Sequence, residues 1–411
     1  MKCLVISHAH PDFSVGGAEI AAYNLFQALK ARKTTADATF LARTDISSLP
    51  GGAITQRRPG EYLWRQDMRD WFKLKSAYPQ TLRRIFGAFL RREQPDVVFV
   101  QHYAHIGIEF LLEIRSVLPR ARIILTFHEY MAICNHQGQM VKTDINKRLC
   151  YQSSPEDCHL CFKSISSENF WLRQRFIENH FAAVDTFVSP SHFLRQRYVD
   201  WGIEPERIVV IENGQPEFHG KGLPDNAANR RQVIGYFGQI TEYKGVEVFL
   251  SAIMSMPEEA RSRLVFEIHG ANLDQQAAPF REAIGKIRDA LVASGNLRWV
   301  GAYERREMFQ RLSKVDWVVV PSIWWENSPM VIQEAFVCGK PVICSDIGGM
   351  AEKVQHGVTG FHFEARNAIS LAATLRSVAM DPSLLTKMHS NIRQPGTYAE
   401  VTEQYIALVE E

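Results

Sequence analysis

The segment 321–335, PSIWWENSPMVIQEA, holds the residues best suited to chemistry in this sequence. Glu326 follows an apolar stretch that we expect to be a buried strand, and Glu334 lies within the predicted next helix. Ser328 is a good helix N-cap, and Pro329 fits the first helical turn. Because the N–H groups of that turn lack intrahelical partners, they suit a phosphate, and nearby carboxylates can accept hydrogen bonds from hydroxyls. The segment therefore predicts a site for a ligand that carries phosphate or sugar groups.

Other residues along the chain could act on such a ligand. Lys244 would place a point charge on a phosphate. His128 ends a predicted buried strand, where open parallel sheets bind ligands, and its imidazole could assist a departing phosphate. His102 and His105 follow the preceding strand and are weaker candidates. The pair 16–17, Gly-Gly, has no side chains to keep a phosphate or an acceptor away from the helix behind it.

Four of the seven cysteines lie close together, with the spacing C-x15-C-x7-C-x2-C. They are Cys134, Cys150, Cys158 and Cys161. The C-x2-C pair is typical of tetrahedral zinc sites, and His136 and His159 could serve as substitute ligands. The upstream pair is not closely spaced, and buried free thiols are common. A structural zinc site, free thiols and a disulfide therefore stay open as alternatives.

Aromatic and basic residues alternate in the segment 57–75. Trp64, Trp71 and Phe72 are interleaved there with Arg65, Arg69, Lys73 and Lys75. We expect either a helix that lays basic side chains over an apolar face, or a patch that contacts an acceptor or a membrane surface.

Apolar strands alternate with amphipathic helices along the chain. The first half has predicted strands at 3–7, 38–42, 97–101, 123–126, 186–189 and 207–212, and helices at 18–29, 81–92 and 169–183. The second half has strands at 233–237, 264–269, 297–300, 317–320 and 342–345, and helices at 246–254, 280–293, 304–312 and 329–338. Strands that are apolar throughout indicate parallel sheets covered on both faces. The predicted fold class is therefore α/β, with two doubly wound, Rossmann-like domains.

A polar stretch with Gly and Pro at 222–231 is the expected linker. It separates an N-terminal domain at 1–220, with a cysteine-rich insert at 130–165, from a C-terminal domain at 232–390. The final segment 391–411 contains a predicted helix at 398–410 that could cross back to the first domain. Because open sheets bind ligands at the carboxyl ends of their strands, we expect a site in a central cleft between the domains.

The composition is that of an ordinary globular protein, with 411 residues, 46% of them apolar, and a formal net charge of +2. The near-neutral balance argues against a nucleic-acid binder. No apolar stretch approaches the ~18 residues of a membrane span, and the start lacks the features of a signal peptide. With an odd number of cysteines, the expected location is a reducing cytoplasm.

The order and spacing of the motifs closely resemble glycosyltransferase family 4, whose members are retaining enzymes of the GT-B fold that use nucleotide-activated sugars. The resemblance covers nearly the whole chain. Its marks are GGAE at 16–19, TFHE at 126–129, Asn213-Gly214, GQITEYKG at 238–245, Pro321-Ser322, the pair Glu326 and Glu334, and GKPVICSDIGG at 339–349.

The resemblance implies that the first domain holds the acceptor and the second holds the donor nucleotide. The implied catalytic residues are His128, beside the phosphate and the reacting carbon, Lys244 on the donor diphosphate, and Glu326 on sugar hydroxyls. The implied donor contacts are Gly16, Gly17, Gln239, Gly270, Tyr303, Asn327, Ser328, Met330, Val331 and Glu334.

Gln239 departs from the family pattern, which usually has an arginine there. Either another basic residue such as Arg230 or Arg231 compensates, or the phosphates are held more weakly. The sequence has no Asp-x-Asp triplet, so we expect catalysis without an added metal ion and without a required cofactor. Since no carboxylate is clearly placed as a double-displacement nucleophile, we expect the acceptor to attack from the face that the leaving group departs.

The sequence thus predicts a hexosyltransferase that moves a sugar from a nucleoside diphosphate donor to a hydroxyl of a glycan or lipid-linked acceptor, in polysaccharide or glycoconjugate biosynthesis. It would be cytoplasmic, with a membrane contact at the inner face through 57–75, and would bind no nucleic acid. The alternatives on the same scaffold are a nucleotide-sugar epimerase, a glycan phosphorylase and a catalytically silent glycan-binding protein. A dinucleotide oxidoreductase is disfavoured, because the turn near Gly16 lacks the G-x-G-x-x-G spacing.

Overall fold

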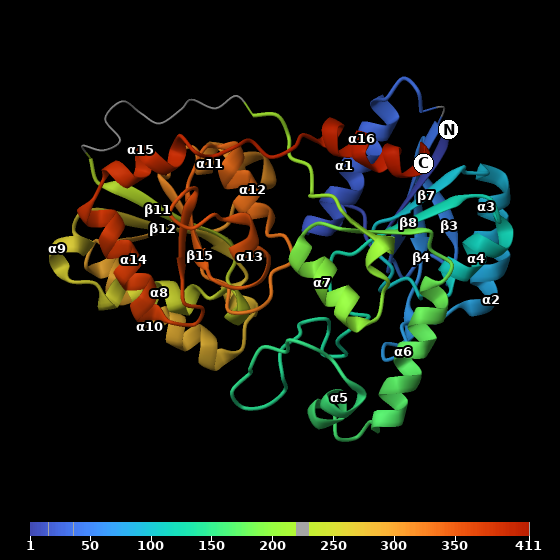
Figure 1. The fold of residues 1–411 in the computed structure, drawn as a ribbon, viewed down its shortest axis with the longest axis horizontal. Coiled ribbons are helices and arrows are strands. Elements are labelled where there is room, and N and C mark those ends of the chain that lie inside the picture. Colours follow the sequence, from blue (N-terminus) through green and yellow to red (C-terminus); the bar gives the residue numbers. More distant parts are fainter. Residues whose placement is uncertain (15, 36, 219–229, 411) are drawn as a thin grey trace. The chain divides into compact units, whose positions relative to one another are not determined.

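The computed structural model describes residues 1–14, 16–35, 37–218 and 230–410 (Figure 1). The chain forms two compact units, one made of Met1–Gly214 with Tyr398–Glu411 and the other of Gln215–Thr397. The first unit thus ends before the predicted boundary at 220, and the second begins before 232 and runs beyond 390. Most of the predicted linker at 222–231 lies outside the described residues.

An eight-stranded sheet forms the centre of the first unit, in the order β10-β9-β8-β7-β1-β2-β4-β3. Its strands are β1 (Lys2–Ser7), β2 (Asp37–Thr44), β3 (Ile54–Arg58), β4 (Glu61–Arg65), β7 (Val97–Val100), β8 (Arg122–Thr126), β9 (Thr186–Ser189) and β10 (Ile208–Val210). Every neighbouring pair is parallel except β3 and β4, which form an antiparallel hairpin. The parallel sheet predicted from the apolar strands is confirmed.

The helices of this unit include α1 (Gly17–Ala31), α2 (Pro79–Thr81), α3 (Gly87–Glu93), α4 (Phe110–Val117), α5 (Pro155–Cys161), α6 (Ser167–Phe181), α7 (His192–Trp201) and α16 (Tyr398–Glu410). A π-helical turn, η1 (Leu82–Phe86), joins α2 to α3, so the helix predicted at 81–92 is not regular throughout. The C-terminal helix α16 lies beside α1 (Figure 1), and Arg32 donates to Glu403 of α16 at 2.7 Å. The last helix therefore belongs to the first unit.

The second unit contains a fully parallel six-stranded sheet in the order β13-β12-β11-β14-β15-β16. Its strands are β11 (Gln232–Gln239), β12 (Leu264–Ala271), β13 (Leu297–Trp299), β14 (Trp317–Val320), β15 (Val342–Ser345) and β16 (Gly360–Phe363). Its helices are η4 (Glu242–Lys244), α8 (Val246–Ser255), α9 (Glu258–Arg261), η5 (Leu273–Gln275), α10 (Ala278–Ala293), η6 (Arg305–Glu307), α11 (Met308–Leu312), α12 (Met330–Val337), α13 (Gly348–Lys353), α14 (Ala368–Met380) and α15 (Ser383–His389).

Strand β14 shows why this sheet carries helices on both faces. Trp317 and Val319 pack into a core with α8, α10 and α14, whereas Val318 and Val320 pack into a second core with α11, α12 and α13. Successive side chains of a strand point to opposite faces, so a wholly apolar strand needs apolar partners on each side. The doubly wound arrangement follows from that composition.

The segment 57–75 is not the predicted amphipathic helix. It contributes to β3 and β4 and then forms the small hairpin of β5 (Met68–Asp70) and β6 (Lys75–Ser76). Trp64 is fully buried and stacks on Phe86, with the ring centroids 4.4 Å apart. Arg57 and Arg58 pair with Asp12. The core thus takes up Trp64, whereas Trp71 is 49% exposed, and membrane contact through this segment stays a prediction.

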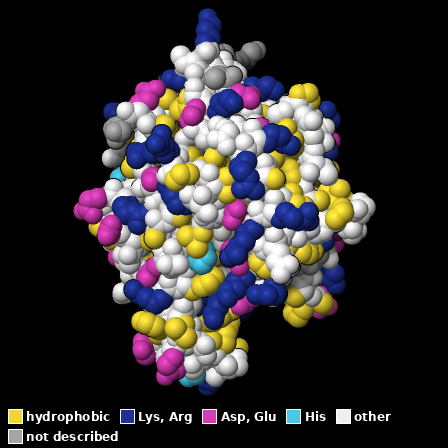
Figure 2. Space-filling model, turned by 90° about the vertical axis from the view of Figure 1, so that its right-hand side faces the viewer, with side chains coloured by type: hydrophobic (Ala, Val, Ile, Leu, Met, Phe, Trp, Pro, Cys, Tyr) yellow, Lys and Arg dark blue, Asp and Glu magenta, His cyan; other side chains and the backbone are white. Residues whose placement is uncertain are grey.

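On the face shown in Figure 2, Lys and Arg side chains are spread among hydrophobic, acidic and uncharged ones. Within the described ranges, no helix combines the length and the apolarity that crossing a membrane requires.

Candidate active site

Lys244 and Glu326 meet at the carboxyl ends of the adjacent strands β11 and β14. Lys244 Nζ donates to Glu326 Oε1 at 2.6 Å, although the two residues are 82 positions apart. The same oxygen accepts hydrogen bonds from Ser322 Oγ at 2.7 Å and from Trp324 Nε1 at 3.1 Å. The Glu326 side chain is 9% exposed and that of Lys244 is 34% exposed. The structure therefore joins two of the three predicted catalytic residues in one partly accessible cluster.

Glycines allow the loops that carry this pair to approach each other. Gly245 has φ +68°, and a Cβ on it would lie 1.8 Å from the carbonyl oxygen of Pro321. Gly349 donates its N–H to the carbonyl of Glu326 at 2.8 Å, and a Cβ on it would lie 2.0 Å from the carbonyl oxygen of Asn327. A residue with a Cβ would clash with a carbonyl oxygen at either place, so only glycine fits. Gly245 and Gly349 therefore allow the backbone arrangement that positions Lys244 and Glu326.

The pKa of Glu326 shows that its partners outweigh its burial. Burial by itself would raise this pKa, but the charge and hydrogen bond of Lys244, with the hydrogen bonds from Ser322 and Trp324, bring it below its ordinary value. Glu326 is therefore ionised at neutral pH, and it holds the Lys244 ammonium in place.

Helix α12 begins at Met330, one residue later than predicted. Its N-cap is Pro329, which has an extended ψ of 112°, so Ser328 is not the cap. The Ser328 hydroxyl is instead buried and has no hydrogen-bond partner among the described residues. Met330 and Val331 form the first turn, whose N–H groups have no intrahelical acceptor. This end of the helix thus combines amides that lack an intrahelical acceptor with an unsatisfied hydroxyl.

Glu334 lies further along α12, with a side chain that is almost fully buried. Burial raises its pKa, and Arg305 Nη1 at 3.5 Å from Oε1 opposes that rise. Arg305 was not among the predicted site residues, because only the fold brings η6 to this carboxylate. Tyr303 lies two positions before Arg305. Burial raises the pKa of Tyr303, and the nearby charge of Glu334 raises it further.

Gly270 lies between the ends of β11 and the loop after β13. Its N–H donates to the carbonyl of Gly301 at 3.0 Å, and a Cβ on it would lie 2.5 Å from the carbonyl oxygen of Gly238. A cavity of about 590 Å³ opens there, lined in part by Gly270, Gly301, Asn272, Arg288 and Trp299. Its size is in the range of pockets that hold small ligands.

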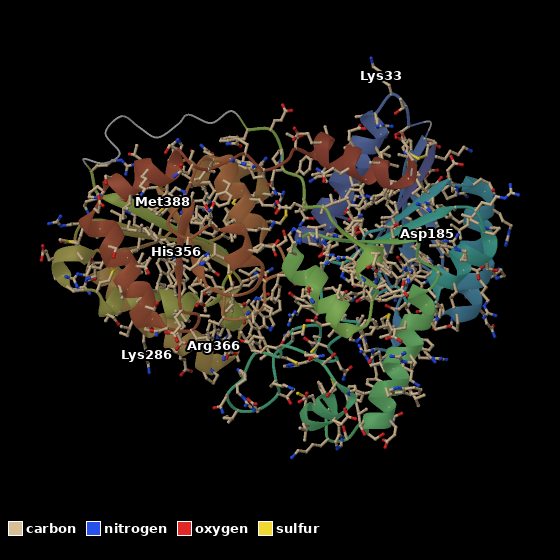
Figure 3. All side chains as sticks on the ribbon, viewed as in Figure 1. Lys33, Asp185, Lys286, His356, Arg366 and Met388 are labelled. Atoms are coloured by element: carbon tan, nitrogen blue, oxygen red, sulfur yellow. The ribbon has the colours of Figure 1, made fainter. Side chains whose placement is uncertain are left out.

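Neither arginine proposed to compensate for Gln239 can do so. Gln239 ends β11, whereas Arg230 and Arg231 precede the strand at its opposite end, where Arg230 pairs with Asp316 at 2.7 Å. At ~3.3 Å per residue, the length of the strand separates them from Lys244. A different cation lies beside the loop that leads to Glu326. Arg366 (Figure 3) donates from Nε to the carbonyl of Ile323 in that loop at 3.2 Å.

His128 and the Gly16–Gly17 pair belong to the first unit. His128 Nε2 lies 3.2 Å from Gln101 Oε1, and Gln101 Nε2 donates to Thr126 Oγ1 at 3.0 Å. Thr126 is in turn 2.9 Å from the Tyr405 hydroxyl of α16. Burial, with the charge of His8, lowers the pKa of His128 to about 4. The imidazole is therefore neutral at pH 7 and oriented through a buried chain of hydrogen bonds.

Gly17 begins α1, and Gly16 is its N-cap. A Cβ on Gly16 would lie 2.4 Å from Glu19 Oε2, because that carboxylate folds back over the helix start. The absence of a side chain at Gly16 thus accommodates a residue of the same helix. Neither Glu19 nor its neighbour His8 was predicted as a functional residue; the sequence showed Glu19 only as part of the GGAE motif.

Two family models match the chain. The model described as Glycosyltransferase Family 4 matches residues 15–215, and the one described as Glycosyl transferases group 1 matches residues 224–395. Together they span both compact units. The chain belongs to glycosyltransferase family 4. The family predicted from the motifs is thus confirmed.

Curated relatives of this family 4 protein match it over about half of its length. Glycogen synthase of Mycobacterium tuberculosis is 36% identical over 189 residues, which are 46% of this chain and 43% of the relative. D-inositol 3-phosphate glycosyltransferase of Kribbella flavida is 28% identical over 194 residues, 44% of this chain and 45% of the relative. The matched part therefore spans about half the length of these relatives.

A solved structure shows the same fold over the whole chain. The crystal structure of HepE from Anabaena in complex with UDP superimposes with a TM-score of 0.70 at 18% identity, and the match covers 100% of both chains. The predicted GT-B fold, with two Rossmann-like units, is confirmed.

In the part of the chain that the structure describes, the four clustered cysteines are not grouped as a metal site, and zinc binding stays a prediction. All four are free thiols, and no group of three or more His, Cys, Asp or Glu in the described part of the chain is arranged to hold a metal ion. Burial raises the pKa of Cys134 and Cys150, and it raises that of Cys158 to about 12, with the neighbouring cysteines adding to the rise. Burial thus favours the protonated thiol over the thiolate at these three cysteines.

Proposed function

We propose that this protein is a retaining glycosyltransferase that moves a hexose from a nucleoside diphosphate sugar to a hydroxyl of a glycan or lipid-linked acceptor. The observation that carries the proposal is the pairing of Lys244 with Glu326 close in sequence to the first turn of α12. One sheet positions a cation, a carboxylate and helix amides that have no intrahelical acceptor. A lipid-linked acceptor would require the protein to act at the inner face of the cell membrane.

The proposed role of Lys244 is to stabilise the leaving diphosphate. When the bond to the sugar breaks, negative charge grows on the leaving phosphate, and a fixed ammonium group lowers the energy of that state. Glu326 keeps the ammonium oriented before the donor arrives. Once a phosphate takes over Lys244, the carboxylate can accept hydrogen bonds from hydroxyls of the sugar.

In the proposed course, the acceptor hydroxyl attacks the reacting sugar carbon on the same face from which the leaving diphosphate departs, so the configuration is retained. Glu326 Oε1 receives three hydrogen bonds, which lower its nucleophilicity, so this carboxylate is poorly suited to form a covalent sugar ester. His128, as a neutral imidazole, would hydrogen-bond the transferred sugar. Since Lys244 supplies positive charge at the diphosphate, we expect activity to survive treatment with a chelator.

The experiment is a two-step assay on the purified full-length chain. Nucleoside diphosphate sugars are first screened for thermal stabilisation, because a ligand of the native state raises the melting temperature. The stabilising donor is then incubated with and without candidate acceptors, and nucleoside diphosphate release is measured. Release that depends on Lys244 supports the proposal. Binding without any release would instead favour a silent glycan-binding protein, and conversion of the donor sugar without an acceptor would favour an epimerase.

A further inference from the structure

Most of the cysteine-rich insert at 130–165 has no apolar core of its own. It extends away from the sheet of the first unit (Figure 1), and none of the residues from 142 to 169 is buried. Because so little apolar surface is removed from water there, burial contributes little to the stability of this segment. Short segments without a core are commonly stabilised by disulfides or by a structural metal ion.

Four thiols of the insert lie in one neighbourhood. We call them the insert thiols, and they are Cys134, Cys150, Cys158 and Cys161. Burial raises the pKa of the first three, and the charges of the other insert thiols add to each rise. Together these three effects involve every pair among the four. Cys158 and Cys161 are also three positions apart on α5, so their side chains share one face of that helix.

The peptide groups of Met140 link Cys134 to Cys150. The N–H of Cys150 donates to the carbonyl of Met140 at 2.8 Å. Against the rise that burial causes, hydrogen bonds from the backbone of His136 and Met140 lower the pKa of Cys134. Left-handed backbone at Gln137 and Met140, with φ of 50° and 48°, curls the loop around this sulfur. Backbone amides that point at a sulfur stabilise its thiolate, which is the form that binds a metal ion.

Side-chain contacts attach α5 to the loop that carries Cys150. Thr143 Oγ1 donates to the carbonyl of Cys161 at 2.7 Å. Lys142 Nζ donates to Asp157 Oδ1 of α5 at 3.2 Å. The two halves of the insert therefore approach each other on the side where the insert thiols lie.

A buried cation lies beside the insert thiols. Arg173 is 3% exposed, and its guanidinium donates to the backbone carbonyls of Phe72, Met131 and Ala132. Burial lowers the pKa of Arg173, and Cys134 and Cys158 are among the neighbours that oppose this decrease. The three carbonyl acceptors are neutral, so a nearby negative charge would stabilise the buried guanidinium.

A second cation lies near the other two insert thiols. Although burial by itself would lower the pKa of Lys142, Cys150, Asp157 and Cys161 raise it. Four thiolates on one Zn²⁺ leave two negative charges. Lys142 and Arg173 supply two positive charges around the same sulfur atoms, so their placement complements a zinc tetrathiolate.

The two histidines of the insert use one ring nitrogen within the loop. His136 Nδ1 is 2.9 Å from the carbonyl oxygen of Val141, and His159 Nδ1 is 2.7 Å from that of Ile165. Four cysteines already make a complete tetrahedral ligand set. The histidines are therefore not needed as ligands.

We infer that the four insert thiols bind one zinc ion, which holds the cysteine-rich insert in one conformation. On binding, each thiol releases its proton to the solvent, and four sulfur–zinc bonds form. In the described part of the chain the insert thiols are not grouped as a metal site, so they must move closer together. The loop permits this, because no core holds the residues from 142 to 169 in place. The zinc ion is structural and takes no part in the proposed sugar transfer.

The test uses the full-length chain, produced with zinc in the growth medium and purified without a chelator. Elemental analysis should find about one zinc ion per chain. The double variant Cys158→Ser, Cys161→Ser should contain below about a tenth of that amount, because two ligands are lost. Cys158→His should retain most of the zinc, since imidazole is also a zinc ligand. Cys338→Ser is the matched control: Cys338 is a half-buried free thiol of the second unit, and its loss should leave the zinc content unchanged.

Two further measurements report on the metal-bound insert. The metal-free chain titrated with Co²⁺ should develop the strong visible absorption of a tetrahedral cobalt thiolate, and the double variant should not. Removal of the zinc should also speed tryptic cleavage several-fold at the exposed Lys147, Arg148 and Lys163, because the insert then loses its fixed conformation.

Wild-type protein with below about a tenth of an equivalent of zinc and no cobalt absorption would overturn the inference. So would a double variant that binds as much zinc as the wild type. Thiols that are lost without reductant, in a chain that holds no metal, would show a disulfide instead. If the variants do not fold, the cobalt titration of the wild type decides.

Metal content is measured without a donor, so failure of this inference is distinguishable from failure of the proposed function. The chelator treatment of the transferase is accordingly performed where elemental analysis shows that the zinc of the insert remains bound.

Discussion

At the scale of single residues, the proposed donor site depends on one carboxylate oxygen. Oε1 of Glu326 receives hydrogen bonds from Lys244, Ser322 and Trp324. The lysine is thus occupied before a donor binds, and a diphosphate must compete with the carboxylate for it. Because of this competition, Lys244 can affect diphosphate binding and turnover to different extents. Substitutions of Lys244 and of Glu326 measure the two effects.

Lys244→Ala should lower kcat/KM by about two to three orders of magnitude, since a fixed charge at a developing anion contributes roughly 2–4 kcal/mol to the barrier. Release of nucleoside diphosphate from the stabilising donor measures the effect. Lys244→Arg serves as the control, because it keeps the charge and should lose less. A Lys244→Ala rate equal to that of the wild type would refute the assigned site.

Glu326→Gln should bind free nucleoside diphosphate several-fold more tightly, because the neutral amide no longer competes for the Lys244 ammonium. Turnover should fall nevertheless, since the carboxylate that accepts hydrogen bonds from the sugar is lost. Isothermal titration with the diphosphate measures the change in binding, and the release assay measures the change in turnover. Weaker diphosphate binding by this variant would show that Glu326 does not restrain the lysine.

At the scale of elements, loops at the ends of β11, β14 and β15 are held together by backbone contacts that only glycine allows. Gly245 brings η4 against Pro321, and Gly349 brings α13 against the loop of Glu326 and Asn327. The positions of Lys244 and Glu326 are therefore set by the packing of three loops and not by either side chain alone.

Gly245→Ala should lower the free energy of unfolding by at least ~2 kcal/mol, because it forces a Cβ into left-handed backbone and against the Pro321 carbonyl. Urea unfolding measures the change. Gly285→Ala is the matched control: Gly285 lies within α10 with open space around it, so alanine there should stabilise by about 0.5–1 kcal/mol. Equal unfolding midpoints for the two variants would contradict the role given to Gly245.

At the scale of the whole molecule, buried histidines couple stability to pH. Burial lowers the pKa of both His105 and His128 to about 4. An unfolded chain binds a proton on each of them below pH ~6.5, whereas the native state does not until the pH nears 4. These residues therefore make the unfolded state bind more protons, which lowers the free energy of unfolding as the pH falls through that window.

His105→Asn should show a smaller loss of the free energy of unfolding between pH 6.5 and about 4 than the wild type, because one such titration is removed. Urea unfolding at several pH values across that window measures the slope. His192→Asn, at an exposed position of α7, is the control and should follow the wild type. A His105→Asn slope equal to that of the wild type would show that His105 does not bear on acid stability.

Local sequence determined the parts of this protein that depend on neighbouring residues. The apolar runs at Val97–Val100 and Trp317–Val320 are buried strands in the structure, and the motifs around Lys244 and Glu326 predicted that these two residues follow strand ends. Hydrophobic periodicity and turn chemistry act over a few residues, so a sequence expresses them directly. The parallel sheets and the family could therefore be predicted.

Tertiary structure decided what depends on residues far apart in the chain. Trp64 stacks on Phe86 in the core, and the segment 57–75 forms strands and turns. Helix α16 packs in the first unit, and Arg305 pairs with Glu334. The tertiary structure also gathered His8, Glu19 and His102 at one sheet edge. No local pattern encodes such contacts, because their energy arises from burial and charge that exist only once distant segments have packed.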